Sequence, residues 1–420
     1  MLKISFAQYC LIAACFLAML GFAPSSRAVE VADLYLVKWP VADQNKTARW
    51  RAALAGFKEV LVRKSGSQQI LRDGGVQQAY RKVTSYLQRF EYIHQNDSDK
   101  EYPYSISLYF EPRLIDALIK DAKLPLWGSS RPLTVLWLAV EIDNERQIVS
   151  ANTSSDSGVN TNTNVSEDIQ IFKQIGSNAI RRGLPLITPL MDLEDELIVT
   201  PSDVWGRFSS TINQASQRYF ADSILIGRMQ ALGEQWRGQF TYINQGKELA
   251  FELMSNSQKL LIADMADKLA ELLCSKYCVV EQVGETNEVM LHLSGINNFV
   301  EYKAAEMYLE NLSALRKISL TSIDQHTLKI KVSLLADLES LIKGISLGNQ
   351  MSVTEIEVCL PELNTLEPNT SSNLLEDELQ READEGDVAA EEKNSDHELI
   401  GTQENEITKP LEILYYRWNG

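Results

Sequence analysis

The sequence has few of the side chains that most often carry catalysis or bind metal ions. Its 420 residues include four histidines and five cysteines, and they do not form a ligand series at metal-binding spacing. There is also no glycine-rich phosphate or dinucleotide loop, no H-E-x-x-H pair and no G-x-S-x-G nucleophile turn. These absences argue against the common nucleotide-binding, zinc-protease and serine-hydrolase classes. They favour a protein without a cofactor and with a role other than catalysis.

Long apolar runs are scarce as well, and a clear one stands only at the amino terminus. Residues 4–22 contain no charged side chain, Lys3 precedes them, and a Ser-Arg-Ala tripeptide ending at Ala28 places small residues where a signal peptidase reads. We therefore expect a signal peptide over residues 1–28, cleavage after Ala28 and export to the periplasm, with membrane contact only during export. Two alternatives stay open: an uncleaved membrane anchor, and lipid attachment at Cys15.

Basic residues are outnumbered, with 40 Lys and Arg against 57 Asp and Glu, for a net charge of −17. Residues 367–406 hold fourteen of the acids and two basic residues, so most of the excess lies there. Nonspecific nucleic-acid binding depends on Lys and Arg contacts to phosphates, and we expect none. An acidic, polar segment that is poor in aromatics is typical of a disordered linker, which we place at residues 363–408.

Three cysteines follow the predicted signal peptide: Cys274, Cys278 and Cys359. An exported protein can form disulfides, but an odd number leaves one thiol unpaired. Cys274 and Cys278 stand four residues apart at the end of an apolar helical pattern, close enough for a bridge if the last turn relaxes. This pairing, a bridge from Cys359 to one of the two, and buried thiols all stay open.

Apolar periodicity predicts an α+β / α/β multidomain protein, and its first unit, residues 29–128, is α+β. The expected elements are strands at residues 31–41 and 104–110 and helices from residue 45, at residues 76–90 and at residues 112–122. Gly66 is expected to end the first helix in a left-handed conformation, after two basic residues that suit a helix carboxyl end.

The second unit, residues 129–283, is predicted to be α/β. Residues 133–142 form an apolar run without polar alternation, typical of a strand covered on both faces. Another strand is expected at residues 184–190, and residues 200–203 form a capping box with proline in the first helical position. A further core strand, a hairpin and a helix complete the unit.

The third unit, residues 284–362, has the element pattern βαββαβ of a ferredoxin-like domain. Beyond the acidic linker, residues 409–420 alternate Leu411, Ile413 and Tyr415 with other side chains, which predicts a strand. Exposed apolar clusters promote aggregation. We therefore expect this terminal strand to dock back on the third unit and to close an open sheet edge.

An apolar run before residue 191 is followed by a cluster of acids. Asp192, Glu194 and Asp195 stand beyond the carboxyl end of the expected strand, where open α/β sheets usually bind ligands. Such carboxylates can hold Ca²⁺ or Mg²⁺, or act as acid and base. A structural role is favoured, because the cluster lacks the spacing of a calcium loop and because acids are stabilised before a helix. In that role we expect Arg181 and Arg182 to pair with the acids.

Several long segments also suggest a family: LVRKSG, LPLWGSSRPLTVLWLAVE, RRGLPLITPLMDLED, ASQRYFADSILIGRM and the terminal YYRW. Together they resemble DUF2066, an uncharacterised proteobacterial family of exported proteins of unknown function. The resemblance implies no catalytic residue. The step from Ala221 and Asp222 through Gly227 to Trp236 is similar to one in the amino-terminal domain of TolB and in CsgG-type secretion proteins. This second likeness implies a similar fold for the central unit and no activity.

These observations favour a non-enzymatic periplasmic or envelope-associated scaffold or assembly accessory protein, with other envelope proteins as partners. Serial α/β modules without a catalytic constellation are the basis for this expectation. The alternative is a carboxylate-dependent metal-binding hydrolase, or a periplasmic ligand-binding protein, that uses the loop formed by residues 192–196.

Overall fold

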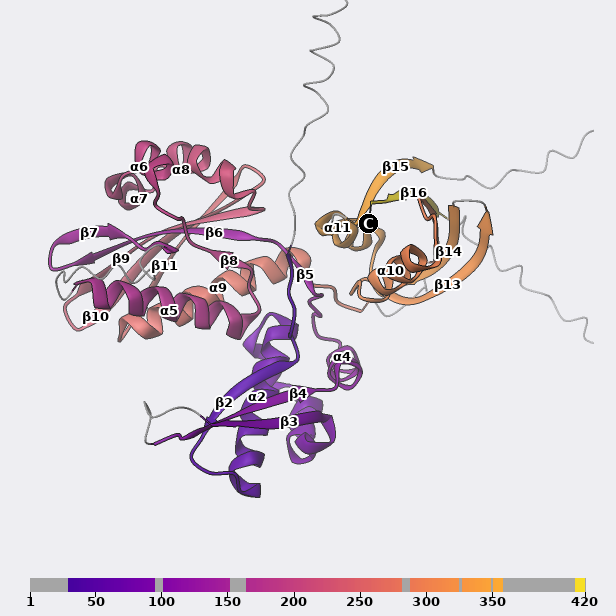
Figure 1. Ribbon diagram of the computed structural model, residues 1–420, viewed down its shortest axis with the longest axis horizontal. Helices are drawn as coiled ribbons and strands as arrows, with labels where there is room; N and C mark the ends of the chain where they lie inside the picture. The colour runs from indigo at the N-terminus through magenta and orange to yellow at the C-terminus, as the bar shows by residue number, and fades with distance from the viewer. Residues whose placement is uncertain are drawn as a thin grey trace, which may run out of the picture.

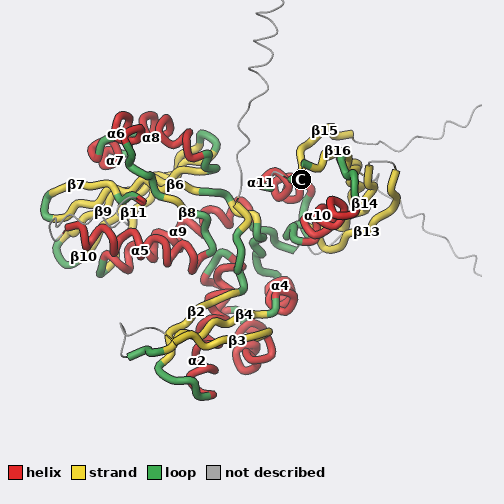
Figure 2. The backbone as a smooth tube through the Cα atoms, viewed as in Figure 1, coloured by secondary structure: helices red, strands yellow, loops and turns green. Residues whose placement is uncertain are grey.

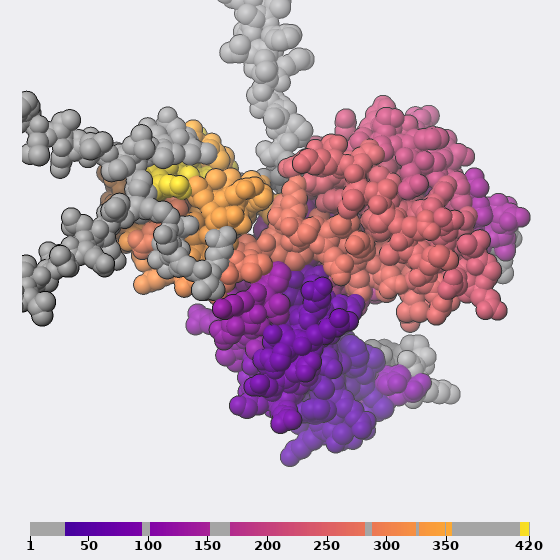
Figure 3. Space-filling view, turned by 180° about the vertical axis from the view of Figure 1, so that it is seen from behind, coloured from indigo at the N-terminus to yellow at the C-terminus, as the bar shows by residue number. Residues whose placement is uncertain are grey.

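The computed structural model describes residues 29–94, 101–151, 164–281, 288–324, 327–348, 350–357 and 412–419. They form a mixed α+β protein with several sheets, arranged in three lobes that meet near the centre (Figure 1; Figure 3). The segments predicted as signal peptide and acidic linker lie outside the described residues.

The first lobe packs α2 and shorter helices against a three-stranded antiparallel sheet (Figure 2). Helix α2 begins after Asn45, whose side chain accepts a hydrogen bond from the Ala48 N–H, and it ends at Gly66, whose φ is 69°. Both ends agree with the sequence prediction. The elements of this lobe are β2 (Leu36–Val41), α2 (Lys46–Ser65), η1 (Gln68–Arg72), α3 (Gly74–Ala79), η2 (Tyr80–Tyr86), β3 (Leu87–His94), β4 (Tyr104–Phe110) and α4 (Pro112–Asp121).

The helix predicted over residues 76–90 is confirmed only in part: the chain is helical to Tyr86, in two pieces, and the last four residues of the predicted range are strand. The chain forms α3 and η2 there and then enters β3, which pairs with β4 from Leu87 opposite Phe110 to His94 opposite Tyr104. This ladder supplies hydrogen bonds to the backbone of β3, so tertiary pairing decides the conformation over the local helical spacing.

The second lobe is a six-stranded sheet with the order β11-β10-β9-β6-β7 and with β8 paired to β6. Strands β6, β8 and β9 run parallel, and the others are antiparallel to their neighbours. The elements are β6 (Thr134–Ile142), β7 (Glu145–Ile148), α5 (Asn164–Arg182), β8 (Leu186–Ile187), α6 (Leu193–Ile198), α7 (Pro201–Gly206), α8 (Ser209–Ser216), η4 (Gln217–Tyr219), β9 (Ser223–Leu232), β10 (Gln235–Asn244), β11 (Lys247–Ser255) and α9 (Gln258–Tyr277).

Helices on both faces of this sheet explain the apolar run of β6. Leu136 and Leu138 join the core beneath α5 and α9, whereas Val135 and Trp137 join the core beneath α7 and α8 (Figure 1). All four side chains have no exposed surface. A strand that alternates between two cores must be apolar at every position.

The strand predicted at residues 184–190 is much shorter than expected. Only β8, Leu186–Ile187, pairs with β6. Pro185 and Pro189 flank it, and proline has no N–H to extend a ladder. The capping box predicted at the start of α7 is present, with the Thr200 side chain and the Asp203 side chain each bonded to the other's backbone N–H.

The third lobe follows the order β12-α10-β13-β14-α11-β15, and the terminal segment adds β16. The sheet order is β13-β14-β12-β16-β15, so β16 lies between β12 and β15, parallel to the first and antiparallel to the second. The terminal strand is therefore inside the sheet and not at an open edge. The elements are β12 (Glu288–Ser294), α10 (Phe299–Glu310), β13 (Leu315–Asp324), β14 (Thr327–Leu334), α11 (Leu338–Leu347), β15 (Met351–Glu357) and β16 (Glu412–Trp418).

Three buried arginines connect the first lobe to the second, and we call them the arginine junction. Arg63 is near the end of α2, Arg182 is the last residue of α5, and Arg131 lies in the short strand β5 (Ser130–Arg131), which pairs with β1 (Val29–Glu30). Their exposed fractions are 3%, 1% and 0%. The last carbonyls of a helix have no donor within the helix, and these guanidinium groups supply donors from outside.

The hydrogen bonds of the junction are reciprocal. Arg131 donates through Nη2 to the Arg63 carbonyl at 3.0 Å and through Nη1 to the Arg182 carbonyl at 3.0 Å. Arg182 Nη2 donates to the Gly66 carbonyl at 2.7 Å, and Arg63 Nε donates to the Arg181 carbonyl at 3.1 Å. Each helix end is thus capped by cations that include one from the other lobe, where the helix dipole favours positive charge.

Acids and an aromatic ring offset part of the charge that the junction buries. Arg182 Nε lies 3.2 Å from Asp267 Oδ1, and Arg63 Nη2 lies 2.6 Å from Glu59 Oε1. The Arg131 guanidinium sits 4.0 Å above the centre of the Trp127 ring. Burial lowers the pKa of Arg131 well below its ordinary value. The groups around the Arg131 guanidinium are mainly backbone carbonyls and the face of the Trp127 ring. Arg131 therefore has these partners only when the backbone is folded.

The carboxyl end of α9 packs against the same point. Cys274 and Cys278 form a disulfide there, with the two sulfurs 1.98 Å apart. A Cβ atom at Gly66 would lie 2.4 Å from the Cys274 sulfur, so the turn that ends α2 has room only for glycine. An isolated β-bridge also pairs Leu126, which packs in the core of the first lobe, with Val279, which packs in the core of the third lobe.

We expect Tyr416→Ala to lower the free energy of unfolding by about 3 kcal/mol, because it empties a site in the third-lobe core. Tyr416 is 1% exposed in β16 and packs in the same core as β12 and β15 residues. The matched control is Arg417→Ala, whose side chain on the same strand is exposed. Chemical denaturation of both variants gives the comparison, and equal stabilities would mean that the Tyr416 side chain adds nothing to the third-lobe core.

Candidate functional site

The predicted acidic loop at residues 192–196 is the beginning of helix α6. Asp192 is the residue before the helix, and its Oδ1 accepts a hydrogen bond from the Asp195 N–H at 3.2 Å. Glu194, Asp195 and Glu196 lie in the first turn. Negative side chains are stabilised at this end of a helix by the free N–H groups.

Arg218 binds this cluster from the segment that follows α8. Its Nη1 lies 2.6 Å from Asp192 Oδ1 and 3.1 Å from Asp195 Oδ1, and its Nη2 lies 2.8 Å from Asp192 Oδ2. Glu194 is more distant, at 3.5 Å from Nη2, and its side chain is 66% exposed. The two-point contact with Asp192 is the geometry in which a guanidinium binds a carboxylate most strongly.

Asp195 is the buried member, with no exposed surface. Its Oδ2 accepts hydrogen bonds from the Tyr219 hydroxyl and from the Met191 N–H at 2.9 Å. The Tyr219 oxygen in turn accepts from the Leu190 N–H at 2.9 Å. Asp192, Asp195, Arg218 and Tyr219 therefore form one network, which we call the acidic lock.

The ionisation of the lock follows from these contacts. The hydrogen bond from Arg218, followed by that from the Asp195 backbone, lowers the pKa of Asp192 to about 2. Burial and the hydrogen bond to Asp195 raise the pKa of Tyr219 above its ordinary value. At neutral pH the lock therefore contains charged Asp192 and a neutral tyrosine that donates to Asp195.

The arrangement is suited to holding α6 in place. The oxygens of Asp192 and Asp195 already accept hydrogen bonds from a guanidinium, a phenol and backbone N–H groups, which compete with any metal ion for the same lone pairs. No grouping of three or more His, Cys, Asp or Glu side chains that could hold a metal ion occurs within the described residues.

The pairing expected for Arg181 and Arg182 is wrong. Both contact Asp267 of α9. Arg181 Nη2 lies 2.6 Å from Asp267 Oδ1, and Arg182 Nε lies 3.2 Å from the same oxygen. The α5 helix carries them to the arginine junction, on the other side of the sheet from α6 (Figure 1). The actual partner of the acids is Arg218, which the sequence analysis missed because it stands 26 residues from Asp192 and has no motif around it.

The same segment exposes two large apolar side chains. Leu193 and Leu197 are 72% and 78% exposed, and their spacing of four residues places them on one face of α6. We call them the leucine pair. Helix α6 lies at the outer end of the second lobe, away from α5 and α9 (Figure 1). The lock thus presents these leucines to solvent at a fixed position.

The comparisons with known proteins correct the family expectation. Residues 28–128 match a domain of unknown function, DUF8605. The expected membership of DUF2066 is therefore wrong. No curated protein and no solved structure gives a significant match. Within the part of the chain that the structure describes, no helix is both long and apolar enough to cross a membrane.

We expect Asp195→Asn to destabilise the protein by about 3 kcal/mol, because an amide would leave part of a buried polar network without matching partners. Glu194→Gln is the control on the same helix turn, and its exposed side chain predicts a change within about 0.5 kcal/mol. Thermal and chemical denaturation of the two variants provide the test. A neutral Asp195→Asn variant would show that the lock does not hold α6.

Proposed function

We propose that this protein is a non-enzymatic scaffold or assembly accessory protein that acts in the periplasm in association with the cell envelope. The leucine pair is the observation that carries the proposal. Exposure of more than two thirds of the surface of two neighbouring leucines to water is unfavourable. The acidic lock nevertheless holds their helix in place. Such a pair gains free energy when a partner covers it.

The arginine junction supports the same role. Reciprocal hydrogen bonds between the ends of α2 and α5 resist rotation of the first lobe against the second. A scaffold must hold its contact surfaces at fixed separations, whereas flexible lobes would add an entropic cost to every assembly that they join. The geometry therefore favours a rigid platform.

The finer assignments of fold belong to this proposal. We assign the second lobe to the type found in the amino-terminal domain of TolB and in CsgG-type secretion proteins, and the third lobe to the ferredoxin-like type with one added strand. The two-sided sheet with parallel β6 and β9 supports the first assignment. The order βαββαβ supports the second.

Export and domain organisation are further parts of the proposal. The charge-free run before Ala28 supports a cleaved signal peptide, and the disulfide between Cys274 and Cys278 fits an oxidising compartment. The separate sheets and cores support domains at residues 29–128, 129–283 and 284–362. These lobes would present the contact surfaces to other envelope proteins.

The test is quantitative retention of envelope proteins by tagged full-length protein. We expect Leu193→Ser/Leu197→Ser to lower retention of specific proteins by about tenfold or more, since buried apolar anchors dominate most interfaces. The control is Ile180→Ser, which removes another highly exposed apolar side chain, on α5. Both variants should keep the native melting temperature, because neither position lies in a core.

Two results would contradict the proposal. In the first, the leucine variant retains the same proteins in the same amounts as the Ile180 control. In the second, the purified native protein hydrolyses an ester, amide or phosphate substrate and Asp192→Asn/Asp195→Asn abolishes this activity in a folded protein, which would favour the carboxylate-dependent alternative.

A further inference from the structure

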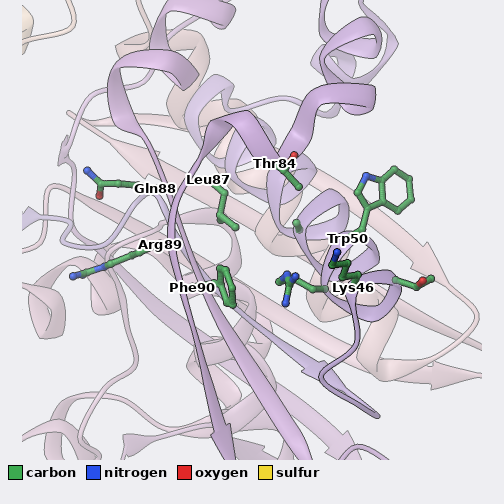
Figure 4. Close-up of a pocket in the computed structure, with 10 residues that line it drawn as sticks. Lys46, Trp50, Thr84, Leu87, Gln88, Arg89 and Phe90 are labelled. Atoms are coloured by element: carbon green, nitrogen blue, oxygen red, sulfur yellow. The ribbon is translucent and has the colours of Figure 1, made fainter.

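A groove on the first lobe lies between the start of α2 and the strand β3. It has a volume of about 870 Å³ and is lined mainly by Lys46, Arg49, Trp50, Leu87 and Phe90; we call it the β3 groove. Figure 4 shows Leu87 and Phe90 pointing from the strand toward the helix that carries Lys46 and Trp50, while Gln88 and Arg89 point to the opposite side. It is remote from the leucine pair, which belongs to the second lobe.

The floor of the groove is apolar and open to solvent. Trp50 is 42% exposed and Phe90 is 45% exposed, although both belong to regular elements that pack against the core of the lobe. Helix α2 packs mainly on β2 and β4, and the groove lies between its first turns and the outer strand β3. Aromatic side chains in this position offer a large area for burial by a ligand.

The strand beside the groove has an unused edge. In the described part of the chain β3 pairs with β4 and with no other strand, and it is the last strand of the order β2-β4-β3. The edge of a sheet offers a row of N–H and C=O groups to another extended chain. A peptide bound there would receive both backbone hydrogen bonds and an apolar surface.

The rim of the groove is positively charged. Lys46 and Arg49 lie along the first turns of α2, and no acidic side chain lines the groove among the described residues. The Arg49 guanidinium lies 4.8 Å from the centre of the Phe90 ring, which places the cation directly above the apolar floor. A ligand that combines a carboxylate with a large apolar group matches both features.

We propose that the β3 groove binds an extended acidic peptide segment of a partner protein, added as a strand to the free edge of β3. In an added strand every second side chain faces the groove. An apolar side chain then covers Phe90 and Trp50, and an acidic side chain two positions away contacts Arg49 or Lys46. The recognised pattern is an acidic residue and a large apolar residue separated by one residue.

The charge and shape of the site favour this occupant over two others. A second copy of this chain paired through β3 would bring the rim cations Lys46 and Arg49 of the two copies near one another, which opposes association. A membrane surface is flat, whereas the aromatic floor is recessed between a helix and a strand. A single extended chain fits into such a recess.

The experiment selects peptides from a phage-displayed library of random dodecapeptides on immobilised full-length protein, and then measures binding of the enriched peptides by fluorescence anisotropy. We expect enrichment of the acidic and apolar pattern. Lys46→Glu/Arg49→Glu and Trp50→Ala should each weaken binding by about tenfold or more, as loss of a central contact does in other interfaces. Arg51→Glu is the matched control, because it reverses a charge on an exposed part of α2 that does not line the groove.

Hydrogen exchange adds a readout of the binding mode. Amides of β3 should exchange more slowly with the peptide bound, because an added strand protects edge N–H groups. The proposal is overturned if no sequence is enriched, if enriched peptides are basic or neutral, or if the Arg51 control weakens binding as much as the groove variants. It is also overturned if dimerisation depends on Lys46 and Arg49, or if vesicles of phosphatidylglycerol bind through these residues and the acidic peptides do not.

Discussion

The guanidinium groups that cap the ends of α2 and α5 are the contacts on which the relative positions of the first two lobes depend. Arg131 donates to the carboxyl ends of both helices at once, and Arg63 and Arg182 complete the exchange. Burial of three cations is unfavourable unless each finds acceptors and counter-charges. Asp267 and Glu59 lie in the same lobes as the arginines that they contact, whereas several of the accepting helix carbonyls belong to the other lobe and are available only when the two lobes are docked. The junction therefore stabilises one arrangement and disfavours separated lobes.

Charge has a similar role at the other end of the second lobe. The acidic cluster that first suggests a reaction is held by Arg218 and Tyr219, and its carboxylates fix the start of α6. Two of the exposed surfaces are apolar: the leucine pair on α6 and the aromatic floor of the β3 groove. The arginine junction and the acidic lock thus fix elements within the protein, and the leucine pair and the β3 groove are the apolar surfaces proposed to contact partners. This division is the basis for the proposed scaffold role.

Local sequence patterns were sufficient to predict those features that residues close together in the chain determine. The ends of α2 and the capping box of α7 follow from side-chain and glycine signals within a few residues, and the two-sided burial of β6 follows from its composition. Two of the errors have non-local causes. Strand β3 depends on pairing with β4, and the position of β16 inside its sheet depends on two strands distant in the chain.

The candidate site shows the same limit. The acids at residues 192–196 were visible in the sequence, but their partner Arg218 was not, because nothing in a single sequence links positions so far apart. A partial indication of the arginine junction was present in the sequence, because basic residues precede both Gly66 and Gly183. Their burial could not be predicted, since basic residues at a helix end are usually solvated.

The most direct test of the account is the distance between spin labels on the first and second lobes, measured by double electron–electron resonance. Cysteines introduced at the exposed positions Arg51 and Glu234, with Cys359 replaced by serine, carry the labels. A single narrow distance distribution is predicted for this protein, and a broad one when Arg131 is also replaced by alanine. A broad distribution with Arg131 in place would contradict the claim that the arginine junction holds the lobes as one rigid platform.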